Sequence, residues 1–293
     1  MRRSFTGPAG FLADPANLAR VGEYLADMGR PYAIEVPAAM FGEPASPALG
    51  HSYGEMAEAL IGAAVPADEP VDLLVLAFSV HDLRPGRQTA AYLSHVTPGA
   101  PMAFALCDQG SAAAFSGLRM ARAYAASAGI RRALLIVVEQ AALPYDSPAR
   151  MPSQHRGVAM LYGDGPHGDG LHGDGLHGDG LHGDGGTPQA PLARVADVRQ
   201  HPSVRPGDVA GLAAADLAEL AAGHRDVALV LSAALAAVWT APTATRVRVM
   251  PPGQPSTEVW WGLIDELADD ADSVDHPGPW DLLVAADYDP DLR

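Results

Sequence analysis

A polar turn near the middle of the chain carries the side chains best suited to chemistry. The stretch FALCDQGSAAAFSGLRMARAYAASAG places this turn, residues 108–111, between a strand-like apolar segment and a long run of small residues. A hydroxyl such as that of Ser111, at the start of a buried helix, can act as a nucleophile when a base lies beside it. The same four residues can also form a plain connection, with Asp108 capping the helix.

Composition excludes several other mechanisms. All 19 basic residues are arginine, so the chain has no lysine for a Schiff base or for a phosphate-binding P-loop. The formal charge of −16 disfavours a nucleic-acid partner, because phosphate binding needs a basic face. Cys107 is the only cysteine, which excludes an intramolecular disulfide. No apolar run reaches the roughly 18 residues of a membrane span, and no signal-peptide pattern stands at the start, so we expect a cytoplasmic protein.

A pentapeptide repeat interrupts the second half of the sequence. The stretch GDGPHGDGLHGDGLHGDGLHGDGG repeats His and Asp every five residues, at His167, His172, His177 and His182. Imidazole and carboxylate are good metal ligands, which keeps metal storage or delivery open as a function. Bringing these histidines together would require ordering a glycine-rich segment, at a conformational entropy cost of about 1–2 kcal/mol for each residue ordered. We therefore interpret residues 163–187 as a disordered loop and expect no metal site.

The remaining sequence alternates short apolar strands with helices. The strands are apolar on both faces, which is typical of sheets covered by helices on each side. Helical patterns occupy residues 52–65, 111–128, 208–223 and 256–270, with Asp208 and Ser256 as possible caps. The predicted strands are residues 71–80, 101–106, 132–139, 157–162, 226–232, 246–250 and 280–286.

This succession resembles the thiolase superfamily, and most closely its ketoacyl synthase III branch. VDLLVLAFSV is similar to a core strand of the first half, AFALCDQGSAAA to the nucleophile turn, and GIRRALLIVVE to the strand after the central helix. MPSQHRGVAMLYGDG is similar to the start of the second structural repeat, and PPGQPSTEVWWGLIDEL with WDLLVAADYDPDLR to the closing helix and strand. The likeness covers most of residues 71–292, and the first seventy residues match weakly.

The resemblance implies an α/β fold of five layers, αβαβα, built from two related halves. We expect residues 1–162 to form the first half with the nucleophile turn, and residues 188–293 to form the second. Two central helices would lie antiparallel, and the first half would mediate a homodimer. The family condenses or transfers acyl groups held as thioesters of CoA or acyl carrier protein, so such a thioester is the expected substrate, with no tightly bound cofactor.

The family's catalytic triad is not retained. Its nucleophilic cysteine corresponds to Ser111, while Cys107 falls about four positions early. No histidine stands near residues 232–235, where the family has one, and Gln254 occupies the place of its asparagine. The glycine-rich last turn reads AADYDPDL, and the arginine motif near the family's N-terminus is missing.

Other side chains could replace the missing groups. His81 and His155 stand on segments expected to approach the turn, and either could act as the base for Ser111. Each could also be an ordinary hydrogen-bonded histidine. We expect Glu139 to be a buried structural carboxylate rather than a catalytic one.

Two arginines could bind a phosphate. Arg119 and Arg122, three residues apart on the central helix, could contact the phosphate of CoA or an acidic carrier protein.

Two functions follow. The first is a serine-dependent, non-condensing acyltransferase of specialised metabolism, related to polyketide or fatty acid biosynthesis. The alternative is a pseudoenzyme: an inactive thiolase-fold subunit that pairs with a ketosynthase or binds a carrier protein.

Overall fold

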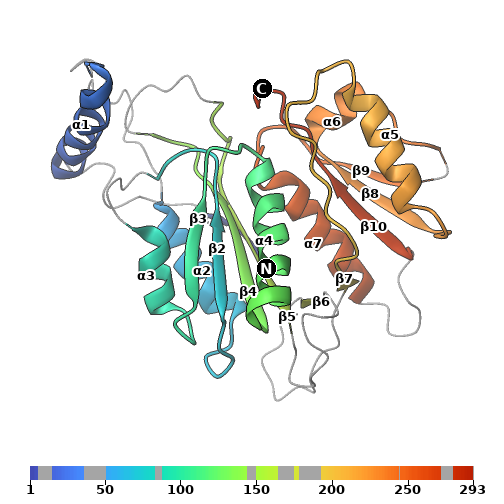
Figure 1. The fold of residues 1–293 in the computed structure, drawn as a ribbon, viewed down its shortest axis with the longest axis horizontal. Helices are drawn as coiled ribbons and strands as arrows, with labels where there is room; N and C mark the ends of the chain where they lie inside the picture. Colours follow the sequence, from blue (N-terminus) through green and yellow to red (C-terminus); the bar gives the residue numbers. More distant parts are fainter. Residues whose placement is uncertain are drawn as a thin grey trace.

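Short apolar strands alternate with helices along the chain and gather into two sheets (Figure 1). The computed structural model describes residues 1–5, 15–35, 51–82, 88–143, 150–163, 175–177, 193–243, 245–271 and 280–292. Among these residues, no helix is long and apolar enough to cross a bilayer.

The larger sheet runs in the order β3-β2-β4-β5-β6-β7, with β1 also paired to β5. Strand β2 is parallel to β3 and β4, whereas β5 is antiparallel to β4. Its strands are β1 (Arg2–Phe5), β2 (Leu73–Ala77), β3 (Met102–Leu106), β4 (Arg132–Glu139), β5 (His155–Gly163), β6 (Gly175–His177) and β7 (Ala193–Arg194).

The smaller sheet contains three parallel strands in the order β10-β8-β9. They are β8 (Val227–Leu231), β9 (Arg246–Val249) and β10 (Leu282–Ala286). Its arrangement repeats that of the larger sheet, because β8 lies centrally between β9 and β10 as β2 lies between β3 and β4. The two sheets therefore contain the same three-strand unit in the same chain order.

The helices complete this duplication. One helix precedes each central strand, and one lies in each of the two following crossovers. In the first half these are α2 (Tyr53–Ala64), α3 (Thr89–Val96) and α4 (Ala112–Ala128); in the second they are α5 (Val209–Leu220), α6 (Ala233–Val238) and α7 (Glu258–Ala271). Helix α1 (Pro15–Gly29) lies to one side of these layers (Figure 1).

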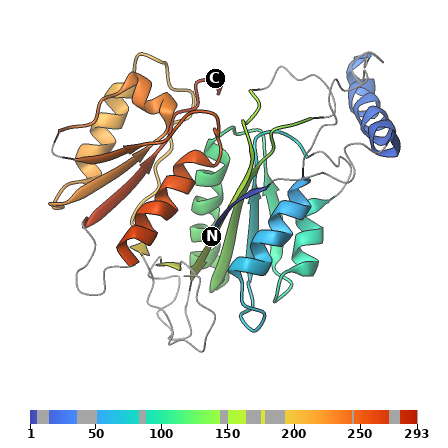
Figure 2. The same ribbon diagram turned by 180° about the vertical axis from the view of Figure 1, so that it is seen from behind.

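Side-chain packing defines five layers (Figures 1 and 2). Leu74 and Leu76 of β2 face a core with α2 and α3, while Leu73 and Val75 face a core with α4 and α7. Helix α7 packs on its other side against the smaller sheet, and α5 and α6 cover the far face of that sheet. The order is helices, sheet, helices, sheet, helices.

The fold expected from the sequence is confirmed. Each of the seven predicted strands is present, and the five αβαβα layers arise from two related halves. The sequence did not predict β1, α1, α3 or α6. Most of the pentapeptide repeat lies outside the described residues, but its residues 175–177 form β6, which pairs with β5.

Candidate functional site

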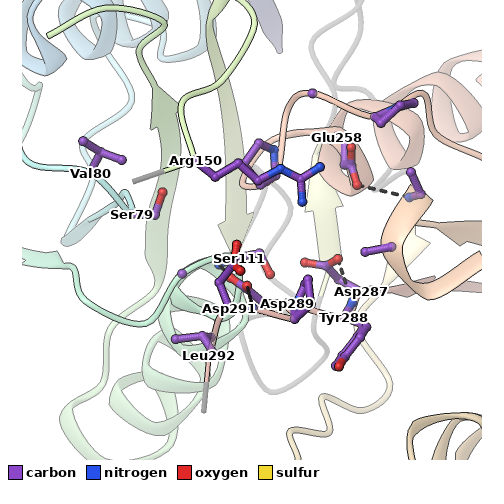
Figure 3. A pocket seen from close by; sticks show the side chains of 17 residues that line it. Ser79, Val80, Ser111, Arg150, Glu258, Asp287, Tyr288, Asp289, Asp291 and Leu292 are labelled. Atoms are coloured by element: carbon purple, nitrogen blue, oxygen red, sulfur yellow. Dashed lines mark hydrogen bonds between the residues drawn. The ribbon is translucent and has the colours of Figure 1, made fainter. Parts of the chain in front are cut away.

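A cavity of about 570 Å³ lies between the two halves (Figure 3). It is lined by residues that follow strands β2, β3, β9 and β10, together with the first turns of α6 and α7. Parallel α/β folds place their ligand sites at this end of the strands. The charged side chains that line it are Arg150, Glu258, Asp287, Asp289 and Asp291.

Ser111 occupies the position directly before α4 and lies in the lining of the cavity. Only 6% of the residue is exposed. The preceding Gly110 has a φ of +48°, and a Cβ added there would lie 2.0 Å from a carboxylate oxygen of Asp289. Glycine is therefore required at this position, because it lets Asp289 approach the start of α4.

Two carboxylates from the C-terminal segment bind Ser111. The backbone N–H of Ser111 donates to Oδ2 of Asp289 at 3.0 Å. The hydroxyls of Ser111 and Ser232 both hydrogen-bond to Asp287, whose pKa is raised above its usual value by burial. Figure 3 shows Ser111 together with Asp287 and Asp289, facing Arg150 and Glu258 across the cavity.

The second half shows the reciprocal arrangement. Glu139, at the end of β4, accepts hydrogen bonds from the backbone N–H groups of Ser256 and Thr257 at 3.0 and 3.2 Å. The Thr257 hydroxyl also donates to Glu139. Burial raises the pKa of Glu139 to about 7, although these hydrogen bonds lower it. Each central helix thus has its N-terminus bound by a carboxylate of the opposite half.

A third helix start is bound in the same way. Glu258, the first residue of α7, accepts a hydrogen bond from Ala233 N at 3.2 Å, at the start of α6. Burial and the nearby charges of Asp287 and Glu139 together raise the pKa of Glu258 to about 7. Arg150 acts in the opposite direction.

Neither predicted histidine base is among the residues that line the cavity with Ser111. Nδ1 of His155 accepts a hydrogen bond from Ala141 N at 3.2 Å, and its ring packs against that of His51. The carbonyl of His81 accepts from the Gln140 side chain, and burial lowers the pKa of its imidazole. In the described part of the chain, the titratable group bound to the Ser111 hydroxyl is Asp287.

The predicted phosphate-binding arginines lie further along α4 and outside the cavity lining. Arg119 donates to Oε1 of Gln200 at 2.8 Å. Arg122 interacts with Asp197, whose pKa is lowered mainly by a hydrogen bond from Arg199. Both arginines therefore interact with residues 197–200, which precede α5 in the chain.

The residues before Ser111 also differ in part from expectation. Asp108 has a φ of +60° and accepts a hydrogen bond from Cys107 Sγ at 3.3 Å. The predicted cap by Asp108 is wrong: Ala112 N and Ala113 N, in the first turn of α4, donate to the carbonyls of Gln109 and Gly110, and Asp289 binds the N–H of Ser111 directly before the helix. Partial desolvation and the neighbouring Asp108 carboxylate raise the pKa of the Cys107 thiol, which disfavours a nucleophilic thiolate.

The side chains of Glu139 and Gln254 are both buried. Glu139 is buried and satisfied by backbone donors, as the sequence predicted. The side chain of Gln254 is also buried and donates to Ser153 Oγ at 2.9 Å. Among the described residues, no group of three or more His, Cys, Asp or Glu side chains could hold a metal ion.

The carboxylates that define the site are not among the site residues predicted from the sequence. Asp287, Asp289 and Glu258 each bind the start of a helix or its first hydroxyl. The signal was present in AADYDPDL, where aspartates replace the glycine-rich turn that the resemblance implies. An isolated helix start attracts anions through its free N–H groups and its dipole. Here the chain supplies those anions itself.

Comparison with known proteins gives similarity in structure only. No protein-family model and no curated protein matches the sequence. The structure is similar to that of AbyA1, a tetronic acid condensing enzyme, with 20% identity over 74% of this chain and 75% of that one and a TM-score of 0.47. It is also similar to β-ketoacyl-[acyl carrier protein] synthase III of Thermus thermophilus, with 17% identity over 74% of each chain and a TM-score of 0.46. For the corresponding synthase III of Pseudomonas aeruginosa PAO1, the values are 19% identity, 74% and 75% coverage, and a TM-score of 0.42.

Proposed function

We propose that this chain is a catalytically inactive thiolase-fold subunit that pairs with an active ketosynthase III-type enzyme. The observation that supports this proposal is the hydrogen bond from Ser111 N to Asp289. In an acyl-transfer site, the N–H groups at a helix start stabilise a thiolate or an oxyanion. This helix start already holds a carboxylate.

The charges around Ser111 oppose acyl transfer. Attack of the hydroxyl on a thioester places negative charge on the former carbonyl oxygen. Asp287, Asp289 and Glu258 line the same cavity, with Arg150 as the cation among its lining residues. At an effective dielectric constant of about 20, a carboxylate about 4 Å away repels an oxyanion by about 4 kcal/mol. This repulsion is large enough to suppress the reaction by about three orders of magnitude.

The surface proposed for pairing is the free edge of β3. This strand ends the larger sheet in the described part of the chain, and 45% of Met102 on it is exposed. A free strand edge can add a strand from a partner through backbone hydrogen bonds. A second copy of this chain could bind there too, so a homodimer is the competing assembly.

Co-expression with ketosynthase III-type proteins of the same genome tests the pairing. We expect one of them to co-elute with this chain at a constant 1:1 ratio. Met102→Glu should abolish co-elution, whereas Met28→Glu, at a methionine of 55% exposure on α1, should leave it intact. Equal loss with both variants, or co-elution that survives Met102→Glu, contradicts the proposed surface. A homodimer that excludes every ketosynthase contradicts the proposed partner.

A serine acyltransferase is the second candidate, favoured by the contact between Ser111 and Asp287. Ser111 Oγ would attack the thioester carbonyl of CoA or of a phosphopantetheine arm while its proton passes to Asp287. The C–S bond would then break, and the leaving thiolate would take that proton. The acyl group would pass from Ser111 to an amine, hydroxyl or water. Acyl loading of Ser111, measured by intact mass, distinguishes this candidate from the first.

Either function involves thioester substrates or their carriers. In the first, an acyl carrier protein would serve the active partner and dock near the shared interface. In the second, it would dock on this chain, and Arg119 and Arg122 on α4 are the proposed contacts for its acidic surface or for a CoA phosphate. Neither function requires a resident cofactor.

A further inference from the structure

The carboxylates between the two halves form one connected cluster rather than separate caps. Glu258 interacts electrostatically with both Asp287 and Glu139, and Asp287 with Asp289. Asp287 and Asp289 both bind Ser111 of the first half, and Glu139 binds the start of α7 in the second half. The same groups therefore join the halves and repel one another.

Two arginines of the described residues act on this cluster. Arg150 lowers the pKa of Glu258, and Arg156 of β5 lowers that of Glu139. Two further titratable side chains lie near the cluster: Tyr53 of α2, whose hydroxyl interacts electrostatically with Glu139 and Asp82, and Asp291, whose carboxylate lines the same cavity. Neutral donors to the cluster are Ser111, Ser232, Ala233 N, Ser256 N, Thr257, Tyr288 N and Asp291 N. Burial outweighs these donors at Glu139, and burial with repulsion from neighbouring carboxylates outweighs them at Glu258 and Asp287, so the pKa values of all three are raised.

We propose that this cluster is a pH-sensitive contact between the halves, tight while it retains a proton and loosened when it is fully ionised. The inference goes beyond the proposed function and does not depend on a partner or on acyl loading. The folded chain binds protons at Glu139 and Glu258 up to about pH 7, while the unfolded chain releases them near pH 4.5. Stability therefore falls as the pH rises through this window. We expect the contact between the halves to loosen at the cavity around Ser111.

Hydrogen–deuterium exchange between pH 5.5 and 8.5 tests the proposal. After correction for the intrinsic exchange rate, amides at the starts of α4 and α7 should exchange about tenfold faster at pH 8 than at pH 6. Amides of α2, which packs on the far face of the larger sheet, should show no such change. The denaturation midpoint should fall over the same range.

Variants assign the response to the cluster. Glu258→Gln and Glu139→Gln each remove one titrating group and retain an oxygen acceptor, so each should reduce the pH dependence of exchange. Asp27→Asn, at an exposed carboxylate paired with Arg30, is the matched control and should leave it unchanged. If the corrected exchange rates of the wild type do not change between pH 6 and pH 8, the proposal is overturned, whatever the variants show. If both glutamine variants keep the pH dependence of exchange seen in the wild type, the proposal is also overturned.

Discussion

The carboxylate of Asp289 accepts a hydrogen bond from the backbone N–H of Ser111 at 3.0 Å, across 178 positions of the chain. Glu139 makes the equivalent contact with the start of α7, 117 positions away. A carboxylate of each half therefore caps the N-terminus of the central helix of the other half. This exchange both joins the halves and fills the helix start at which acyl chemistry would need free donors.

Removing the first of these contacts should cost stability. Asp289→Ala leaves the Ser111 N–H without its carboxylate and removes a charge that favours the start of α4. We expect a loss of about 1–2 kcal/mol in the free energy of unfolding, measured by urea denaturation. Asp291→Ala, two residues later and exposed, should change it by less than about 0.5 kcal/mol. Equal values for the two variants would be incompatible with capping by Asp289.

The reciprocal contact should be stronger, because it is fully buried. Glu139→Ala leaves the donors Ser256 N and Thr257 N, and the Thr257 hydroxyl, without their acceptor. A loss of about 3 kcal/mol or more is expected at neutral pH. Glu58→Ala removes an exposed carboxylate bound to Tyr92 and serves as the control. An unfolding free energy near that of the control would mean that Glu139 does not hold α7.

A glycine at the end of β5 should also be irreplaceable. Gly163 has a φ of +123°, and an added Cβ would lie 1.9 Å from the carbonyl oxygen of Arg131. Gly163→Ala should lower the unfolding free energy by about 2 kcal/mol or more, through strain and displacement of β4. Gly211→Ala, within α5 and with open space around it, should instead raise it by about 0.5–1 kcal/mol. Thermal unfolding of the Gly163→Ala and Gly211→Ala variants tests this prediction. Changes in the unfolding free energy that have the same sign in both variants would contradict it.

The pentapeptide repeat should be dispensable for folding. Deleting residues 165–185 removes β6, which pairs with β5 through Leu161 and Tyr162. The remaining pairs of β5 with β4 and β1 are independent of it, so circular dichroism should be unchanged and stability should change by about 1 kcal/mol at most. Tight stoichiometric zinc binding by calorimetry, lost on deletion, would contradict this interpretation of the repeat.

The order of strands could be predicted from the sequence because each core strand is a short apolar segment bounded by polar residues. LLVLA in β2 and VALVL in β8 are examples, each central in its sheet. Ser111 could be placed at the start of α4, since a polar turn precedes a run of small residues. Helix α6 was missed because its six residues are too few for a helical period.

The electrostatics of the site could not be predicted in the same way. The partners of Ser111 lie at the other end of the chain, and nothing local in AADYDPDL indicates which helix its aspartates reach. His81 and His155 were chosen because they stand near the correct strand ends. Yet the ring nitrogen of His155 accepts from Ala141 N, outside the cavity lining. A strand end fixes a position, whereas the direction of a side chain depends on contacts between the halves.

We expect that Ser111, with its N–H and hydroxyl both bound to carboxylates, does not take an acyl group. Intact mass spectrometry of the chain after incubation with acetyl-CoA or acetyl-loaded acyl carrier protein, beside an active ketosynthase III, tests it most directly. The mass of this chain should stay unchanged while the active enzyme gains an acetyl group. An adduct that forms on the wild type and disappears with Ser111→Ala would overturn the inactive-subunit proposal and establish the serine acyltransferase in its place.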